Sequence, residues 1–429
     1  MLYNVIDYQV IGDGKTNNTK ALNYLMRIAE KTGGTVYFPA GNYVTGSIFL
    51  CSNITLYLDA GAVILGSACP EDYPYITQDQ APGYTRGGRC GLIAAFGCKN
   101  IAIHGKGTID GRGYYWWDNV KHDMERPRTI NPILCSNISI RDITIVNSPC
   151  WTVHPMCCDN ITIDGVTIRN PYDSPNTDGI NPESCQNVHI SNCHMDVGDD
   201  CITIKSGTET DLLQKKYPCE NITITNCTMA HGHGGVVIGS EMSGGVRNIV
   251  ISNCVFQNTD RGIRLKTRRK RGGIIQGLII SNIVMDHVQA AITVNEYYFC
   301  GADLSDREIF DVDKQPINSS TPKISDICIS GVIARNVIGV GIYMVGLPEC
   351  PIEDIVMNNV DISVLGVERG IDAVAAPNRE KSRGEGIFLE NADSIAMNAV
   401  HLRCPREPYT IRNCDNIQLN GKELSETKD

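Results

Sequence analysis

A short phrase, Asn followed by alternating apolar residues, recurs along this chain and restricts its fold more than any other feature. It reads Asn-Ile-x-Ile or Asn-Val-x-Ile and begins at Asn137, Asn160, Asn187, Asn221 and Asn248. The intervals of 23, 27, 34 and 27 residues are each the size of one coil of a repeat protein. Each copy has the period-two pattern of a short strand, and most are followed by turn residues and a second short strand.

These strands are too short and numerous for a parallel sheet linked by helices, and the copies carry almost no helical periodicity. The repeat predicts an all-β fold, a single-stranded right-handed parallel β-helix, in which coils stack, asparagines form ladders and Ile and Val rows fill a narrow core. We expect one domain over residues 1–429, with a cap region at 1–50, coils over 51–420 and a tail at 421–429. A leucine-rich-repeat horseshoe is the structural alternative, but its leucine phrase is missing.

The N-terminal cap contains the one clear helical pattern. Apolar residues recur at helical spacing between residues 18 and 31, and the pattern ends at Gly33-Gly34. They are Ala21, Leu22, Leu25, Ile28 and Ala29. This spacing predicts an amphipathic helix over about 18–31 that covers the open end of the β-helix.

The 19 cysteines are an odd number, so they cannot all pair within one molecule. Six of them precede a strand in the same context, Cys-x-Asn, at Cys51, Cys98, Cys135, Cys158, Cys185 and Cys219. Repetition at equivalent turns predicts buried, reduced side chains. The sequence contains no CxxC pair, the usual sign of a structural zinc site, so no metal is expected, nor is a cofactor.

The charge balance excludes some classes of partner. With 38 basic and 48 acidic residues the formal net charge is −10, which argues against general nucleic-acid binding. No apolar run approaches the roughly 20 residues of a membrane helix. The first residues lack a secretory signal, so we expect a cytoplasmic location unless a leader was removed. The sequence does not indicate an oligomeric state.

Polar residues interrupt the apolar repeat in four motifs. They are Asn176-Thr-Asp178, Gly198-Asp199-Asp200, His231-Gly-His233-Gly and Arg264-Leu-Lys266. Intervals of 21, 33 and 31 residues separate these motifs, and 31 more lead from Lys266 to Tyr297. Each interval is about one coil, and coils stack at roughly 4.8 Å. The motifs are therefore expected to line one groove roughly 20 Å long.

The three aspartates of these motifs suggest acid and base catalysis. Asp199 and Asp200 would point to opposite faces of a regular strand, so their joint use requires a bulge or a strand end, which Gly198 permits. Alone, the pair is typical of a turn that caps backbone amides. With Asp178 one coil earlier, the set matches glycoside hydrolysis, which needs a carboxylic acid and a carboxylate. Mutual repulsion favours retention of one proton.

A basic segment, residues 261–271, holds seven Lys and Arg residues in eleven. Arg264 and Lys266 alternate with apolar residues, so they share one strand face and suit a sugar carboxylate. A structural partner among acidic residues is the competing explanation. For Arg268 to Arg271 we expect a solvated basic turn.

The ordered set Asn-Thr-Asp, Gly-Asp-Asp, Gly-His-Gly and Arg-x-Lys on a coil background resembles the polygalacturonases of glycoside hydrolase family 28, from about Asp7 to Leu419. Gly12-Asp-Gly-Lys-Thr and Phe38-Pro-Ala-Gly-Asn-Tyr are similar to the N-terminal cap of bacterial pectin-degrading β-helices. The stretch from Ile238 to Gly245 is similar to the exo-acting bacterial branch.

The resemblance implies a role for each motif residue. Asp199 would be the general acid, and Asp178 with Asp200 would activate a water that inverts the anomeric centre. His233 would tune the acid; because its distance to Gly239-Ser240 is one residue longer than in the endo-acting pattern, His231 stays a candidate. The implied substrate-binding residues are Asn176, Arg264, Lys266, and Tyr297 or Tyr298.

The implied substrate is the α-1,4-galacturonosyl linkage of pectic polygalacturonate or oligogalacturonides. Insertions at 297–322 and 366–385 would wall one end of the groove and favour exo action, unless they are solvated loops. The alternatives are a rhamnogalacturonan or xylogalacturonan hydrolase of the same family, a calcium-dependent pectate lyase, and a non-catalytic polysaccharide-binding β-helix. Which end of the substrate is bound stays open.

Overall fold

The computed structural model describes residues 1–119, 126–376, 379 and 381–427, which form two compact units. Unit 1 comprises Met1–Asp200 and Asp211–Tyr217, and unit 2 comprises Cys201–Thr210 and Pro218–Asp429. The single domain with coils over 51–420 stays a prediction. Within the described ranges, no helix is both long and apolar enough to cross a membrane.

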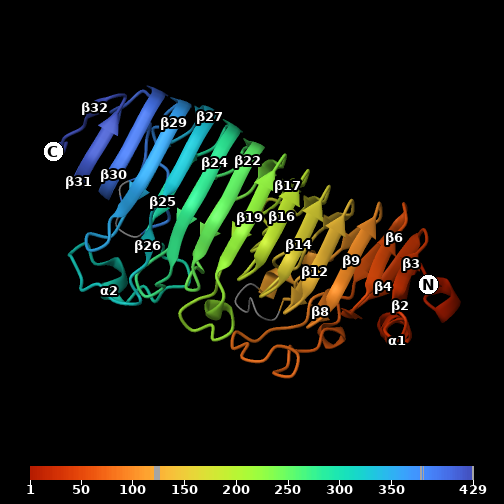
Figure 1. Cartoon of the computed structure of the whole chain (residues 1–429). Coiled ribbons are helices and arrows are strands. Elements are labelled where there is room, and N and C mark those ends of the chain that lie inside the picture. Colours follow the sequence, from red (N-terminus) through yellow and green to blue (C-terminus); the bar gives the residue numbers. More distant parts are fainter. Residues whose placement is uncertain (120–125, 377–378, 380, 428–429) are drawn as a thin grey trace. The chain divides into compact units, whose positions relative to one another are not determined.

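Unit 1 is a stack of short strands that pair in parallel with the coils before and after them (Figure 1). Its strands are β1 (Leu2–Asn4), β2 (Asp13–Asn17), β3 (Gly34–Phe38), β4 (Gly41–Thr45), β5 (Ile48–Leu50), β6 (Ile54–Leu58), β7 (Ala62–Gly66), β8 (Ile93–Phe96), β9 (Lys99–Gly105), β10 (Thr108–Asp110), β11 (Ile130–Ile133), β12 (Ser136–Arg141), β13 (Thr144–Val146), β14 (Asp159–Asp164), β15 (Thr167–Arg169), β16 (Gln186–Ser191) and β17 (His194–Asp196). Ile138, Ile161 and Val188 share one register position on β12, β14 and β16, and all three are buried. The apolar positions of the repeat therefore form the core.

Unit 2 follows the same plan with longer strands. They are β18 (Ile202–Ile204), β19 (Cys219–Thr225), β20 (Thr228–His231), β21 (Val236–Gly239), β22 (Val246–Gln257), β23 (Arg261–Lys266), β24 (Ile274–Asp286), β25 (Ala290–Asn295), β26 (Lys323–Ile324), β27 (Ile327–Val337), β28 (Val340–Val345), β29 (Ile352–Val364), β30 (Glu385–Arg403), β31 (Tyr409–Leu419) and β32 (Lys422–Glu423). A short helix, α2 (Arg307–Phe310), lies in the insertion after β25. Parallel pairing in both units confirms the predicted fold class, a right-handed parallel β-helix.

The repeated asparagines form ladders at the turns. In unit 1, Asn137 donates from Nδ2 to Oδ1 of Asn100 over 2.9 Å, and Asn160 donates to Asn137 over 2.8 Å. In unit 2, Asn248 donates to Asn221 over 3.1 Å. These residues have φ between 56° and 58°, a left-handed conformation that asparagine tolerates better than most residues. Backbone geometry thus explains why each copy of the phrase begins with Asn.

The cysteines of the Cys-x-Asn context are buried, as predicted. The Cys135 thiol accepts a hydrogen bond from the backbone N of Cys98 over 3.3 Å, and Cys158 does the same for Cys135. The neighbouring Cys158 thiol and burial raise the pKa of Cys135 to about 12. No disulfide joins any of the 19 cysteines, all of which lie within the described ranges.

The predicted capping helix is α1 (Thr19–Ala29), at the N-terminal end of unit 1 (Figure 1). Its buried residues are Leu22, Leu25, Met26 and Ala29. On its polar side, Asn23 donates to the carbonyl of Ser47 over 2.8 Å and accepts from the backbone N of Phe49 over 3.0 Å. The apolar stripe therefore covers the first coils of unit 1, and Asn23 fastens α1 to the chain around β5 (Ile48–Leu50).

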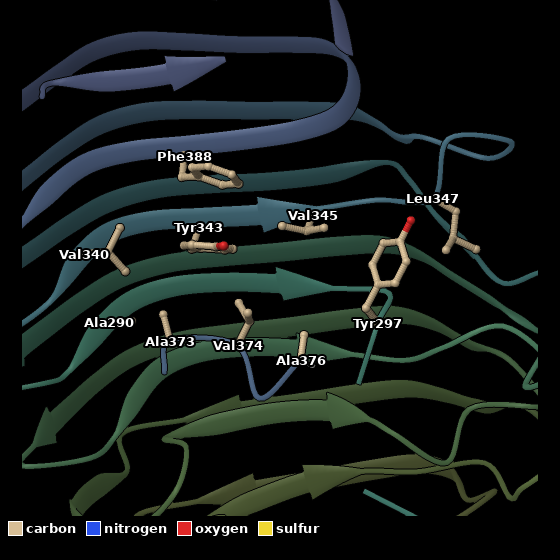
Figure 2. Close-up of a cluster of buried hydrophobic side chains, with 10 residues drawn as sticks. All are labelled: Ala290, Tyr297, Val340, Tyr343, Val345, Leu347, Ala373, Val374, Ala376 and Phe388. Atoms are coloured by element: carbon tan, nitrogen blue, oxygen red, sulfur yellow. The ribbon is translucent and has the colours of Figure 1, made fainter. Parts of the chain in front are cut away.

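The insertion between β29 and β30 packs against the strands of unit 2. Its residues Ala373, Val374 and Ala376 belong to a buried cluster with side chains of β25, β28 and β30 (Figure 2). The cluster members from these strands are Ala290, Val340, Tyr343, Val345 and Phe388. Tyr343 and Phe388 stack with their ring centroids 4.5 Å apart. This part of the insertion is packed rather than solvated.

Candidate active site

Three aspartates gather in unit 1. Asp178, Asp199 and Asp200 each place one carboxylate oxygen within 4.8 Å of the others. Asp178 is 3% exposed and Asp200 1%, whereas Asp199 is half-buried. The predicted convergence of these residues from successive coils is confirmed by the structure. Three carboxylates this close can share protons and hold a water molecule between two of them.

Strand register brings Asp178 to this cluster. The backbone N of Gly179, next to Asp178, donates to the carbonyl of Asp200 over 3.0 Å, and the backbone N of Thr152 in the preceding coil donates to the carbonyl of Asp178 over 2.9 Å. Asn181 donates from Nδ2 to Oδ2 of Asp178 over 2.8 Å. This hydrogen bond fixes the orientation of the carboxylate.

Asp199 and Asp200 lie at a bend just after the end of β17, as expected for neighbours that both serve one site. Gly198 passes close to the preceding coil, where an added Cβ would meet the carbonyl oxygen of Ser174 at 2.3 Å and that of Pro171 at 2.6 Å. The backbone N of Gly198 also donates to Oγ1 of Thr177 over 3.2 Å. Only glycine fits this approach, which explains the residue before the pair.

Asn176 is held by a residue that the sequence analysis did not single out. Its Oδ1 accepts from Nη2 of Arg126 over 2.7 Å, and Arg126 is completely buried. Nη1 of the same guanidinium donates to the carbonyl of Pro175 over 2.7 Å. Arg126 thus fixes the segment that leads to Asp178.

A second polar row lies beside the aspartates in unit 1. Asn131 and His154 occupy equivalent positions, and Asn131 donates to the His154 carbonyl over 2.7 Å. Nε2 of His154 lies 2.8 Å from Oε2 of Glu183. Burial lowers the pKa of His154 to about 4, so its imidazole is neutral at neutral pH. Despite its burial, Glu183 has a pKa lowered to about 2 by Arg86 and His154.

The cationic residues predicted for substrate binding lie together in unit 2. Arg264 and Lys266 are on the same face of β23, and each is 5% exposed. The Tyr298 ring contacts both: its centroid is 5.4 Å from Cζ of Arg264 and 4.9 Å from Nζ of Lys266. Such an arrangement of two cations and one ring suits a sugar that carries a carboxylate.

Tyr297 differs from Tyr298. It is 2% exposed and belongs to the hydrophobic cluster of Figure 2, and the guanidinium groups of Arg269 and Arg379 lie close to its ring. Their Cζ atoms lie 5.6 and 4.6 Å from the ring centroid. Of the two tyrosines proposed to stack on the sugar, only Tyr298 contacts the cations of β23.

The solvated turn expected for Arg268 to Arg271 is wrong. Arg268, Arg269 and Arg271 are 3–5% exposed. Arg269 forms a bidentate pair with Glu349, with distances of 2.6 and 2.8 Å. Arg268 and Arg271 both bind Glu209, over 3.1 and 2.5 Å. Desolvated guanidinium groups need such partners, and these residues anchor the loops around β23.

The two candidate histidines lie in unit 2. His231 ends β20, and His233 follows after Gly232, whose φ is 141°. Both side chains are half-buried, and the carbonyl of His231 accepts from the Cys201 thiol over 2.9 Å. The choice between them stays a prediction.

Comparison with known proteins identifies the family to which the chain is similar. The model of "Glycosyl hydrolases family 28" matches residues 81–379, more than half of the chain, and residues 2–79 match "Rhamnogalacturonase A/epimerase, pectate lyase-like". A probable polygalacturonase of Vitis vinifera is 34% identical over 377 residues, which cover 83% of this chain and 73% of that protein. An exo-poly-alpha-D-galacturonosidase of Dickeya chrysanthemi is 29% identical over 68% of this chain and 57% of its own length.

A solved structure agrees with both findings. A hyperthermoactive exopolygalacturonase from Thermotoga maritima superposes with a TM-score of 0.78 at 26% identity, covering 94% of this chain and 92% of that one. The family model, the identity to the Vitis protein and this superposition all point to one family of enzymes. The chain belongs to glycosyl hydrolase family 28, the polygalacturonase family, and is a glycoside hydrolase.

Proposed function

We propose that this chain hydrolyses α-1,4-galacturonosyl linkages of pectic polygalacturonate or oligogalacturonides, with exo action and inversion. The observation that carries the proposal is the set of three carboxylate oxygens within 4.8 Å of one another in a chain of family 28. Hydrolysis of a glycoside requires a proton for the leaving oxygen and a base or nucleophile on the other side.

Asp199 is assigned as the general acid, because it is the most accessible of the three and can reach a leaving oxygen. The backbone N of Asp200 donates to Oδ1 of Asp199 over 2.8 Å and fixes its orientation. Asp178 and Asp200 are assigned to the attacking water. A water that donates to two carboxylates over about 2.8 Å each bridges oxygens up to roughly 5.5 Å apart, and the present spacing meets that limit.

The proposal of inversion depends on the presence of three carboxylates, Asp178, Asp199 and Asp200, rather than two. Inverting enzymes with two carboxyl groups usually separate them by about 6.5–9.5 Å, and retaining enzymes by about 5–5.5 Å. By that rule the carboxylate oxygens here, within 4.8 Å of one another, are closer than in a usual inverting pair. A retaining mechanism, however, uses only two carboxyl groups, and this site contains three. Proton NMR of freshly released product distinguishes the mechanisms, since inversion of an α-linkage releases the β-anomer first.

Galacturonate specificity is assigned to Arg264, Lys266 and Tyr298, whose cations and ring suit a uronate. A substrate carboxylate would offset part of the cost of burying the two cations. His233 is assigned to tune the acid, with His231 as the alternative. Rhamnogalacturonan and xylogalacturonan hydrolysis are tested by assaying these polymers beside polygalacturonate.

Exo action is supported within unit 2 by the insertion at 366–385. The Val374 carbonyl accepts from Nδ2 of Asn295 over 2.7 Å, and the Ala373 carbonyl accepts from Nε of Arg261 over 3.0 Å. Asn295 is one coil beyond Lys266 in the same register. A sugar chain bound at Arg264 and Lys266 would therefore meet packed protein on the following coils.

The decisive experiment compares the wild type with Asp199→Asn on defined oligogalacturonides. Hydrolysis is expected to fall by about three orders of magnitude or more while binding persists, because only the proton donor is removed. Unchanged turnover contradicts the assignment. Early release of one small product supports exo action, a spread of intermediate oligomers indicates endo action, and products that absorb as unsaturated uronides indicate a lyase.

A cytoplasmic location is also proposed, supported by the 19 cysteines, all described and none in a disulfide, which is typical of reducing compartments. Fractionation of the source cells with an antibody against the chain tests it, and recovery outside the cytoplasm would contradict it.

A further inference from the structure

Two arginines of unit 1 contact the same indole ring but differ in their partners. Cζ of Arg86 lies 5.7 Å from the Trp151 ring centroid, and Cζ of Arg128 lies 5.1 Å from it. Trp151 as a whole residue is half-buried. The roles of the two cations follow from what each one binds.

Arg86 is a structural cation. It donates from Nη2 to Oε1 of Glu183 over 2.7 Å and from Nη1 to Oε2 over 3.2 Å, and Nη2 also pairs with Asp211 over 2.5 Å. Two buried carboxylates therefore compensate its charge. The three residues join segments 97 and 125 residues apart in the chain, which explains why Arg86 is held so tightly.

Arg128 is buried without such compensation. It is 3% exposed, and its Nε and Nη1 atoms are buried and have no hydrogen-bond partner. The nearby His154 imidazole is neutral at neutral pH because burial lowers its pKa to about 4, and burial raises the pKa of the nearby Tyr84 hydroxyl. Glu183 is already bound by Arg86 and His154. A buried guanidinium in this state destabilises the fold unless an anion arrives.

The register places Arg128 on the same column as a catalytic aspartate. Ile130 pairs with Val153, and Val153 pairs with Ile180. Two positions earlier on each coil are Arg128, Trp151 and Asp178, in that order. Coils stack at about 4.8 Å, so Arg128 lies one coil beyond Trp151 and two coils beyond Asp178, roughly 10 Å away along the backbone. A sugar chain cleaved at Asp178 can reach this distance.

We propose that Arg128 and Trp151 form a uronate-binding subsite, in which the guanidinium binds the carboxylate of a galacturonate unit and the indole contacts its ring. The subsite lies on the N-terminal side of Asp178 within unit 1, and it rests on the proposed function. Nε and Nη1 of Arg128 have no hydrogen-bond partner in the described protein, and a planar guanidinium pairs with carboxylate oxygens through its N–H groups. It is a binding residue and takes no part in bond cleavage.

The test measures binding of trigalacturonate by calorimetry, with Asp199→Asn as the non-hydrolysing parent. Adding Arg128→Met is expected to weaken binding at least tenfold, whereas Arg128→Lys weakens it less. The loss should be much smaller for the fully methyl-esterified trimer, because the ester carries no charge. Arg141→Gln removes an exposed cation of β12 in the same unit and is expected to leave the Kd within twofold.

Thermal unfolding separates binding from structural support. Without ligand, Arg128→Met is expected to keep or raise the midpoint, since an uncompensated buried charge is removed, whereas Arg86→Met should lower it. A Kd within twofold of the parent, or an equal loss for acid and ester trimers, overturns the subsite. If the parent itself does not bind trigalacturonate, both the proposed function and the subsite are contradicted. If the parent binds and Arg128→Met does not weaken the binding, only the subsite is contradicted.

Discussion

Asn181 donates a hydrogen bond to Oδ2 of Asp178 over 2.8 Å, and both side chains are buried. The other end of the amide, Oδ1, is buried without a hydrogen-bond partner. A buried amide oxygen without a partner costs free energy. The hydrogen bond from the NH₂ group of Asn181 to Asp178 must offset this cost. We infer that it orients the carboxylate of Asp178.

Asn181→Ala is therefore expected to lower kcat by roughly 10- to 100-fold while KM changes less than threefold, the magnitude of a lost charge-assisted hydrogen bond. Steady-state kinetics on trigalacturonate measure both constants. Asn187→Ala is the matched control, because Asn187 donates to Asp159 in the exposed ladder of the same unit. Equal kcat in the two variants would mean that Asn181 does not position Asp178.

Much of unit 1 could be predicted from the sequence, including the position of Asn181. Three coils repeat apolar-polar-Pro, as Ile130-Asn-Pro, Val153-His-Pro and Ile180-Asn-Pro, and a Cys follows three residues after each Pro. Aligning these copies would have placed Arg128, Trp151 and Asp178 on one column. The strand phrase and the spacing of the aspartates were enough for the fold and the acidic cluster, because both depend on the coil period alone.

The side-chain partners outside the coils could not be predicted in this way. Arg269 binds Glu349, 80 residues away, and Arg86 binds Asp211, 125 residues away. Both partnerships depend on how insertions fold back over the strands, which the coil period does not determine. The burial of Tyr297 has the same cause, since its cluster includes residues of the insertion at 366–385.

The insertion at 366–385 provides a test of exo action. Asn295→Ala removes the hydrogen bond to the Val374 carbonyl and should loosen the insertion. If the insertion limits the substrate, the variant will release more oligomers of intermediate length from polygalacturonate, measured by chromatography at low conversion. Asn282→Ala, in the exposed ladder of unit 2, is the control. An unchanged product pattern despite a loosened insertion, detected by faster proteolysis there, would remove this support for exo action.

The Arg269–Glu349 pair should contribute strongly to stability. Both side chains are at most 5% exposed, and the pair is bidentate. Glu349→Gln leaves a buried cation with a neutral partner, and loss of one member of a buried pair costs about 3–5 kcal/mol. The exposed pair Lys106–Asp142 is the control, and Asp142→Asn should change the unfolding free energy by less than about 1 kcal/mol. Similar losses in denaturant unfolding of the two variants would contradict this ranking.

Acid should destabilise unit 1 through His154. Burial lowers the pKa of His154 to about 4, while an unfolded histidine titrates near 6.5. Between these values the unfolded state binds the extra proton, so the unfolding free energy falls as the pH drops from about 6.5 to about 4. Urea unfolding at several pH values should show a shallower slope for His154→Gln. An identical slope in the wild type and the variant would mean that His154 does not titrate as described.

In unit 2, Glu296 should lower the stability of the fold as the pH rises, the opposite of the effect of His154. It is fully buried; Oε2 accepts from the backbone N of Leu347 over 3.0 Å, and Oε1 has no partner. Burial raises its pKa to about 8 from the ordinary value of 4.5 for a glutamate side chain. The folded state therefore holds the proton longer, and the unfolding free energy falls as the pH rises from about 4.5 to about 8. Glu296→Gln cannot ionise, so its stability relative to the wild type should increase over that range, while the exposed Glu423→Gln should show no such trend. A constant difference between Glu296→Gln and the wild type from pH 5 to 8 would show that Glu296 is already ionised in the folded protein.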